Sequence, residues 1–387
     1  MALDGGQVAD GAASGAARPA VDGARAPRGG DGTGDRPARP KHIASLQGLR
    51  FVAAALVVFF HLDHFAPAML GMDGAFLGGL FQRGEAGVDV FFVLSGFIIL
   101  YTTLGRARTR RGFLRARFVR IYPIYWVIVG ALVAAELVGI THGHANRVDP
   151  AVIVPSMLLV PAPEYVIEVT WTLVIEMLFY GCFALTFFIR PRVFFATLGV
   201  WAALAIVNRI APFAPAPDWL FGYLLYSGIL EFFFGAAIAW TACHHEGRLP
   251  FGWTALALGS ALFAYTLVGP VPEVLGRELI FGVPSALIVY GAFVADPWTP
   301  RFAVEIGDAS YVLYLMHGPA IVLTFKVLTA LGLDTRIGPV AVALAGATVA
   351  IAASWVIHRL VERPLLRLLR PRRRPAPAPT PAVARTR

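Results

Sequence analysis

The sequence predicts an all-α protein, a polytopic membrane bundle of about ten transmembrane helices with both termini in the cytoplasm. Of its 387 residues, 57% are hydrophobic and 15% are charged, whereas soluble domains contain about 25% charged residues. Apolar stretches long enough to cross about 30 Å of hydrocarbon recur along the whole chain. The basic residues are concentrated in alternate loops, which is typical of proteins that cross the membrane many times.

The stretches expected to span the membrane follow one another from residue 43 to residue 360. They are residues 43–65, 86–104, 120–140, 170–189, 193–210, 220–241, 251–268, 278–295, 309–331 and 338–360. A further apolar segment, 151–162, is too short to span and ends in Pro161-Ala162-Pro163. We expect this segment to be interfacial or re-entrant.

The arginines assign an orientation to these spans. With the N-terminus inside, the inner loops and the C-terminal end receive most of them, including seven between residues 106 and 120. The outer loops receive about one each, namely Arg83, Arg147, Arg209, Arg277 and Arg336. The net charge of +9 therefore reflects topology and attraction to anionic lipid. No separate basic domain exists, so we expect the lipid bilayer as a partner and no nucleic acid.

Polar segments flank the predicted membrane domain, which we place at residues 43–365. Residues 1–42 are rich in Gly, Ala, Asp, Arg and Pro and lack the apolar core of a signal peptide. We expect them to form a disordered cytoplasmic tail. Residues 366–387 are basic and rich in Pro and Ala, which predicts a second disordered tail.

The first span contains an ionisable pair. Arg50 lies near its start and His61 lies eleven residues further on, which puts both on one helix face about 16 Å apart along the axis. An ionisable group at that depth marks a candidate functional site, although a structural polar patch is the simpler alternative. A neutral imidazole acts as a general base near pH 7. A metal site with Asp63 and His64 lacks a third-ligand motif, and we expect none.

Arginines crowd the inner segment between the second and third spans. Arg117 and Arg120 are three residues apart, so on a helix they project from one face and can pair with phosphate oxygens. Positive-inside bias alone explains the sign of this charge. The density of arginines exceeds what orientation requires, which favours a phosphate clamp.

Two carboxylates lie within predicted spans. Asp89 is near the outer end of its span, with Ser95 and Gly96 deeper, and small residues there are typical of close helix packing. Glu176 has apolar neighbours on both sides in sequence. A buried carboxylate needs a partner, and for Glu176 we expect an arginine or histidine on another helix.

Two further groups of polar residues favour a structural role. Tyr311, Tyr314 and His317 form one helical stripe, which is more often packing than chemistry. Glu231, within a span, and Glu362, near the last inner helix end, are expected to act as polar anchors.

Five segments, in this order along the chain, resemble the motifs of the acyltransferase-3 family of integral membrane O-acyltransferases, in the stand-alone form of bacterial glycan and macrolide O-acyltransferases. The resemblance covers about residues 43–365. The segments are Arg50 and His61 with ten residues between them, residues 87–97, the Arg117-Phe118-Val119-Arg120 motif, residues 171–180 and residues 310–319. Gln47 stands where the family often has aspartate, and Thr172 replaces the usual serine but keeps the hydroxyl.

The resemblance implies transfer of an acyl group, commonly acetyl, from acyl-CoA to a hydroxyl of a sugar-containing acceptor. Acyl-CoA would be a cosubstrate, with no permanently bound cofactor and no metal. Arg50, Arg117 and Arg120 would hold the CoA phosphates. The acceptor would be a cell-surface glycan or a macrolide-type antibiotic, and the protein would be a multi-pass component of the bacterial cytoplasmic (inner) membrane.

The resemblance also implies a catalytic centre at His61. The imidazole would deprotonate the acceptor hydroxyl or carry the acyl group covalently, and Glu176 or Asp89 would orient it as a carboxylate does in a triad. The competing class is a transporter or channel without covalent chemistry, which buried charges fit equally well. Against a transporter, the sequence shows no inverted repeat and its arginines cluster on one face of the membrane.

Overall fold

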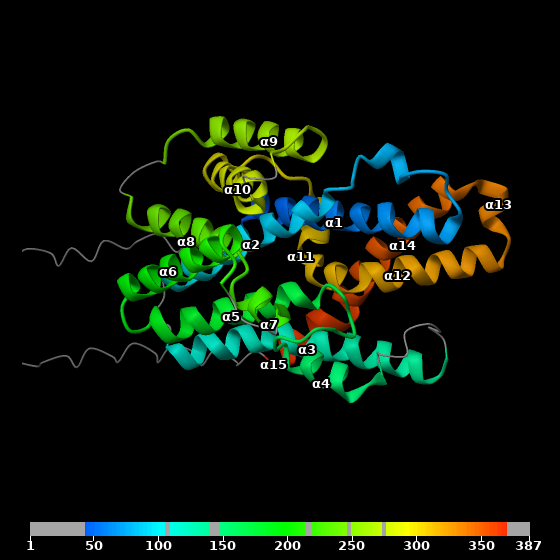
Figure 1. The fold of residues 1–387 in the computed structure, drawn as a ribbon, viewed down its shortest axis with the longest axis horizontal. Coiled ribbons are helices and arrows are strands. Elements are labelled where there is room, and N and C mark those ends of the chain that lie inside the picture. The colour runs from blue at the N-terminus through cyan, green and yellow to red at the C-terminus, as the bar shows by residue number, and fades with distance from the viewer. Residues whose placement is uncertain are drawn as a thin grey trace, which may run out of the picture. The chain divides into compact units, whose positions relative to one another are not determined.

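The computed structural model describes residues 43–104, 109–139, 148–213, 218–245, 249–272 and 276–369. Every regular element in these ranges is a helix (Figure 1), which confirms the predicted all-α class. The expected N-terminal tail lies outside the described residues, as does most of the C-terminal one.

Eight helical segments of the described residues are long and apolar enough to cross a membrane, which confirms a polytopic membrane protein. They are built on α1 (Ala44–Leu70), α2 (Gly87–Leu104), α3 (Arg110–Leu137), α6 (Pro191–Ile210), α8 (Ile229–His244), α10 (Val283–Ala295), α12 (Ser310–Ala330) and α14 (Pro339–Ile357). Short flanking elements lengthen four of these helices, namely α7 (Asp218–Leu224) before α8, η2 (Gly84–Ala86) before α2, η5 (Glu278–Gly282) before α10 and η6 (His358–Glu362) after α14.

Two other predicted spans are shorter apolar helices of 17 residues each, α5 (Thr170–Thr186) and α9 (Gly252–Val268). At 1.5 Å per residue each is about 26 Å long, the lower limit for crossing the hydrocarbon. The segment expected to be interfacial or re-entrant contains α4 (Pro150–Leu158), whose nine residues are too few to span.

The described chain also contains the 3₁₀ turn η1 (Phe76–Gly79) and four short α-helices, namely α7, α11 (Arg301–Asp308), α13 (Leu333–Ile337) and α15 (Arg363–Leu369). The last of them continues four residues past the expected domain boundary at 365 and buries Leu366. A buried apolar side chain explains why this part of the basic segment is helical.

Helix packing brings distant parts of the sequence together. In Figure 1, α9 lies beside α10, and α12 lies beside α14 and α1. The α2 helix packs along α8 and also contacts α1 and α5, while α3 contacts α5, α12 and α15. The five helices α1, α2, α3, α5 and α12 thus form one connected group, and this group contains the candidate site.

A close approach between α2 and α8 depends on two glycines. A Cβ atom added at Gly96 would lie 2.2 Å from the carbonyl oxygen of Phe232, and one added at Gly235 would lie 2.0 Å from that of Val93. Small residues at a helix interface let the two backbones come this close. The structure therefore confirms Gly96 as a packing residue.

A buried ion pair fixes the start of α2. Asp89 is fully buried, and its carboxylate accepts two hydrogen bonds from the Arg277 guanidinium, from Nε at 3.0 Å and from Nη2 at 2.6 Å. Arg277 also donates to Glu85 Oε1 at 3.1 Å. Burial disfavours the charge on Arg277, but the Asp89 carboxylate more than offsets this and raises the pKa of Arg277 above its ordinary value. Arg277 thus neutralises the carboxylate inside the protein.

Replacing Gly96 with alanine should lower the midpoint of thermal unfolding in detergent micelles by several degrees. The new methyl group would overlap the α8 backbone, and overpacking of this kind typically costs about 1–3 kcal/mol. Gly199→Ala on α6 is the matched control, because no atom lies within 4 Å of a Cβ at that position. An unchanged midpoint in Gly96→Ala would contradict the close approach.

Removing Arg277 should destabilise the protein strongly. Arg277→Ala would leave the Asp89 charge buried without its main partner, which costs about 3–5 kcal/mol. The double variant Asp89→Asn/Arg277→Ala should lose less than the two single variants together, because the fully buried charge of Asp89 is then gone and Glu85, which also loses Arg277, is 35% exposed. Thermal unfolding of the four proteins tests this coupling, and strict additivity would count against it.

Candidate active site

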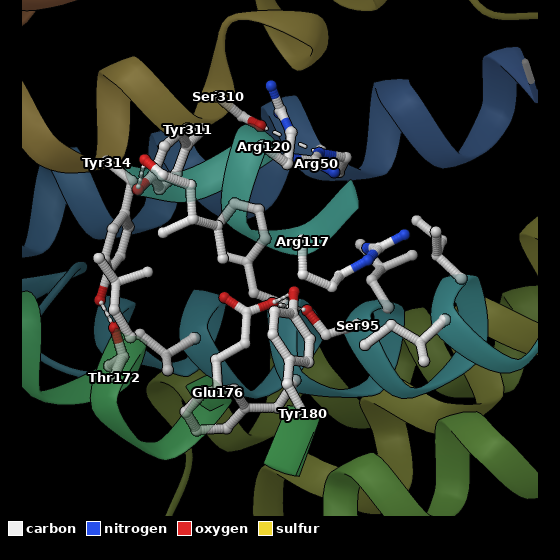
Figure 2. Close-up of a pocket in the computed structure, with 18 residues that line it drawn as sticks. Arg50, Ser95, Arg117, Arg120, Thr172, Glu176, Tyr180, Ser310, Tyr311 and Tyr314 are labelled. Carbon is white, nitrogen blue, oxygen red and sulfur yellow. Dashed lines mark hydrogen bonds between the residues drawn. The ribbon is translucent and has the colours of Figure 1, made fainter. Parts of the chain in front are cut away.

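A cavity of about 120 Å³ lies among α1, α2, α3, α5 and α12. Its apolar wall is formed mainly by α2, and its polar side chains come from all five helices. The polar lining residues are Arg50, Ser95, Arg117, Arg120, Thr172, Glu176, Tyr180, Ser310, Tyr311 and Tyr314 (Figure 2). The structure therefore brings the three predicted phosphate-binding arginines and Glu176 into one site.

Two of the arginines are held by partners on other helices. Arg50 on α1 donates from Nε to Ser310 Oγ at 3.0 Å. Arg120 on α3 forms an ion pair with Glu362, and its guanidinium lies 5.5 Å from the centre of the Tyr311 ring. These contacts join α1 to the start of α12 and α3 to η6, so the predicted polar anchor at Glu362 supports the cavity.

Arg117 is held differently. Its guanidinium carbon lies 5.7 Å from the centres of both the Phe113 and Tyr180 rings. Its Nε is buried and has no hydrogen-bond partner within the described part of the chain. A buried donor without an acceptor is costly, and a ligand in the cavity would supply the acceptor.

Glu176 is bound by hydroxyl groups. Ser95 Oγ donates to Glu176 Oε1 at 2.8 Å, and the Tyr180 hydroxyl donates to the same oxygen at 2.6 Å. Figure 2 shows these three side chains grouped together. The sequence predicted an arginine or a histidine as the partner of Glu176, whereas the two side chains that donate to it, Ser95 and Tyr180, carry hydroxyls. Ser95 and Gly96 have different roles, since Gly96 packs against α8 while Ser95 faces the cavity.

Tyr314 and Thr172 close one end of the cavity. Their hydroxyls are 2.8 Å apart, and Figure 2 shows the pair away from the Glu176 group. The Tyr314 ring centre is 6.0 Å from that of His317, one turn further along α12. Tyr314 therefore adjoins both the cavity and the histidine beyond it.

His61 lies beyond this end of the cavity, beside His317. Its Nδ1 is 3.2 Å from His317 Nε2 and 2.9 Å from the carbonyl oxygen of Val57. The two ring centres are 4.5 Å apart. His61 is partly exposed, whereas His317 is buried. The structure thus forms a histidine pair between α1 and α12.

Neither predicted carboxylate orients His61 in this arrangement. Asp89 is paired with Arg277 and Glu176 with Ser95 and Tyr180, and in the described residues no ion pair joins either one to His61. The partner that the structure provides is His317, for which the sequence predicted a packing role. The sequence pattern that could have revealed this role of His317 is its helical stripe with Tyr311 and Tyr314. Both tyrosines line the cavity, and His317 faces His61 on α1.

Comparisons with known proteins agree with this architecture. The family model described as an acyltransferase domain (Acyl_transf_3) matches residues 43–359. No solved structure matches the chain.

Three curated proteins illustrate the similarity. The "Exopolysaccharide production protein ExoZ" of Rhizobium meliloti (strain 1021) is 36% identical over 317 residues, which cover 76% of this chain and 94% of that protein. "Acyltransferase MdmB" of Streptomyces mycarofaciens is 29% identical over 385 residues, covering 90% of this chain and 97% of that protein. "Protein 2 in picA locus" of Rhizobium radiobacter is 29% identical over 170 residues, covering 38% and 82%. The chain belongs to the acyltransferase-3 family of membrane acyltransferases.

Proposed function

We propose that this protein transfers an acyl group, most simply acetyl, from acyl-CoA to a hydroxyl of a sugar-containing acceptor. The observation that carries this proposal is the convergence of Arg50, Arg117 and Arg120 on one cavity within the helix bundle. The three guanidinium groups carry more positive charge than Glu176 and Glu362 beside them carry negative charge. The cavity therefore favours an anionic ligand. The buried, unpaired Nε of Arg117 adds a donor for it.

The diphosphate-containing part of CoA suits this arrangement. Arginine pairs with phosphate oxygens through charge-assisted hydrogen bonds. Arg110, Arg111 and Arg115 are exposed on the first turns of α3, next to Arg117, and would attract the remaining phosphate groups. The cavity of about 120 Å³ cannot hold the whole of acyl-CoA. The diphosphate would therefore lie at the cavity arginines, and the thioester arm would extend inward from them.

The thioester arm would lie along the apolar wall that α2 provides, with its acyl end toward Tyr314. His61 is reached from there past the Tyr314 and His317 side chains. The acceptor would approach His61 from the end of the bundle where α1 ends and where α2 and α5 begin. Donor and acceptor would therefore enter from opposite directions.

The chemistry requires a base and donors for a developing oxyanion, and no metal. His61 would take the proton of the acceptor hydroxyl as its oxygen attacks the thioester carbonyl. Collapse of the tetrahedral intermediate breaks the carbon–sulfur bond, and the thiolate of CoA leaves and recovers the proton. The products are the O-acyl ester and free CoA.

For the acceptor we place a cell-surface glycan first, since the name of the R. meliloti relative refers to exopolysaccharide production. A macrolide-type antibiotic is the second acceptor to test. Both present sugar hydroxyls, and either would be met at the cytoplasmic membrane of a bacterium.

Purified protein should move label from radiolabelled acetyl-CoA to one of these acceptors, and His61→Ala should lower the rate by about 10²- to 10⁴-fold, as expected for loss of a general base. A glycan fraction and a macrolide would be tested in parallel, with His244→Ala, an exposed histidine on α8, as the control. Label bound without acceptor to the wild-type protein and absent from His61→Ala would identify His61 as a covalent carrier. Full activity in His61→Ala would refute the mechanism.

Arg117→Ala should raise the KM for acetyl-CoA by about 10- to 100-fold, the effect of losing one hydrogen bond to a charged group. The turnover number should change much less, because the base is untouched. Arg192→Ala at the start of α6, an exposed arginine in another inner loop, controls for the loss of positive charge. Equal effects of the two substitutions on KM would argue against a phosphate site in the cavity.

A further inference from the structure

The backbone fixes the protons of the histidine pair. His317 Nδ1 lies 3.1 Å from the carbonyl oxygen of Leu313, one turn earlier on α12. His61 Nδ1 lies 2.9 Å from the carbonyl oxygen of Val57 in the same relation on α1. A carbonyl oxygen only accepts hydrogen bonds, so each Nδ1 carries a hydrogen.

The protonation of His317 Nε2 follows from that of Nδ1. His317 is only 1% exposed, and a buried imidazole favours the neutral form. With its hydrogen on Nδ1, neutral His317 has a lone pair on Nε2. That lone pair faces the Nδ1–H of His61 at 3.2 Å. His61 therefore shares its Nδ1 hydrogen between the Val57 carbonyl and His317.

We infer that His317 is a positioning residue, which holds His61 in the Nδ1–H tautomer and leaves His61 Nε2 as the nitrogen that receives the acceptor proton. This inference rests on the proposed function. In the described part of the chain, the hydrogen bonds of His61 are at Nδ1, so Nε2 keeps its lone pair. When Nε2 takes the proton, the bond from Nδ1–H to His317 becomes charge-assisted and stabilises the imidazolium.

Other ionisable groups also face this pair. His64 lies one turn further along α1, Glu85 lies on η2, and Glu168 precedes α5, and all three act on the charge of His61. The hydroxyl-bonded Tyr314 lies on the cavity side of His317. A substitution at His317 leaves all of these groups in place. Its effect on the pH profile therefore reports the interaction between His61 and His317.

The tautomers can be observed without any assay of activity. We would label the full-length protein with ring ¹⁵N-histidine, reconstitute it in nanodiscs and record long-range ¹H–¹⁵N correlations, with His61→Ala and His317→Ala to assign the signals. Both residues should show the hydrogen on Nδ1, which is the minor tautomer of histidine in water. An Nε2–H signal from either one would overturn the inference, whether or not the protein is an acyltransferase.

A matched pair of substitutions tests the role in the reaction. In His317→Gln the amide oxygen can still accept from His61 Nδ1–H, whereas His317→Leu keeps a side chain of similar bulk without an acceptor. We expect the leucine variant to lose about 10- to 100-fold in kcat, less than the roughly 10⁴-fold seen when a charged triad partner is disabled. Glutamine should restore most of the rate.

The pH profile separates positioning from packing. Without an acceptor the protonated form of His61 is less stable, so the acid limb of the kcat profile in His317→Leu should move to lower pH than in wild type. The limb in His317→Gln should stay near the wild-type position. Equal losses in both variants with an unmoved limb would show that His317 only fills space.

Discussion

A charge placed inside hydrocarbon must be satisfied by the protein itself, and this constraint organises the structure. Asp89 joins α2 to the residue before η5 through Arg277, and Glu362 joins η6 to α3 through Arg120. Each bond that neutralises a buried charge also fixes the position of one helix against another. The polar residues therefore hold together a bundle whose apolar surfaces gain little from packing in lipid.

The same constraint divides the candidate site into two parts. Arginines line the cavity, where an anionic ligand can neutralise them, and uncharged imidazoles lie beyond Tyr314 and Thr172. A base at membrane depth works best as a neutral group that becomes charged only during the reaction. The separation keeps the permanent positive charges of the cavity away from His61, the base that we propose.

The sequence predicted those features of the fold and the site that depend on the residues of a single helix. Hydropathy located the spans, and helical geometry placed Arg117 and Arg120 on one face, since such patterns are local. The pairing of Asp89 with Arg277 was not predictable, because the two residues are 188 positions apart and only the packing of α2 brings them together. The bond between His61 and His317 bridges 256 positions and was missed for the same reason. A stripe of two tyrosines and a histidine is consistent with packing until the facing helix is known.

The choice of histidine at position 317, where a triad would have a carboxylate, follows from the surroundings. A carboxylate there would add a buried negative charge, and two of the cavity arginines have other partners, since Arg120 pairs with Glu362 and Arg50 donates to Ser310. A neutral imidazole supplies the same acceptor for His61 Nδ1–H without that charge. With His61 as the proposed base, this neutral acceptor would bind the resulting imidazolium less strongly than a carboxylate would. For a base within a membrane, a neutral partner therefore combines orientation with a low cost of burial.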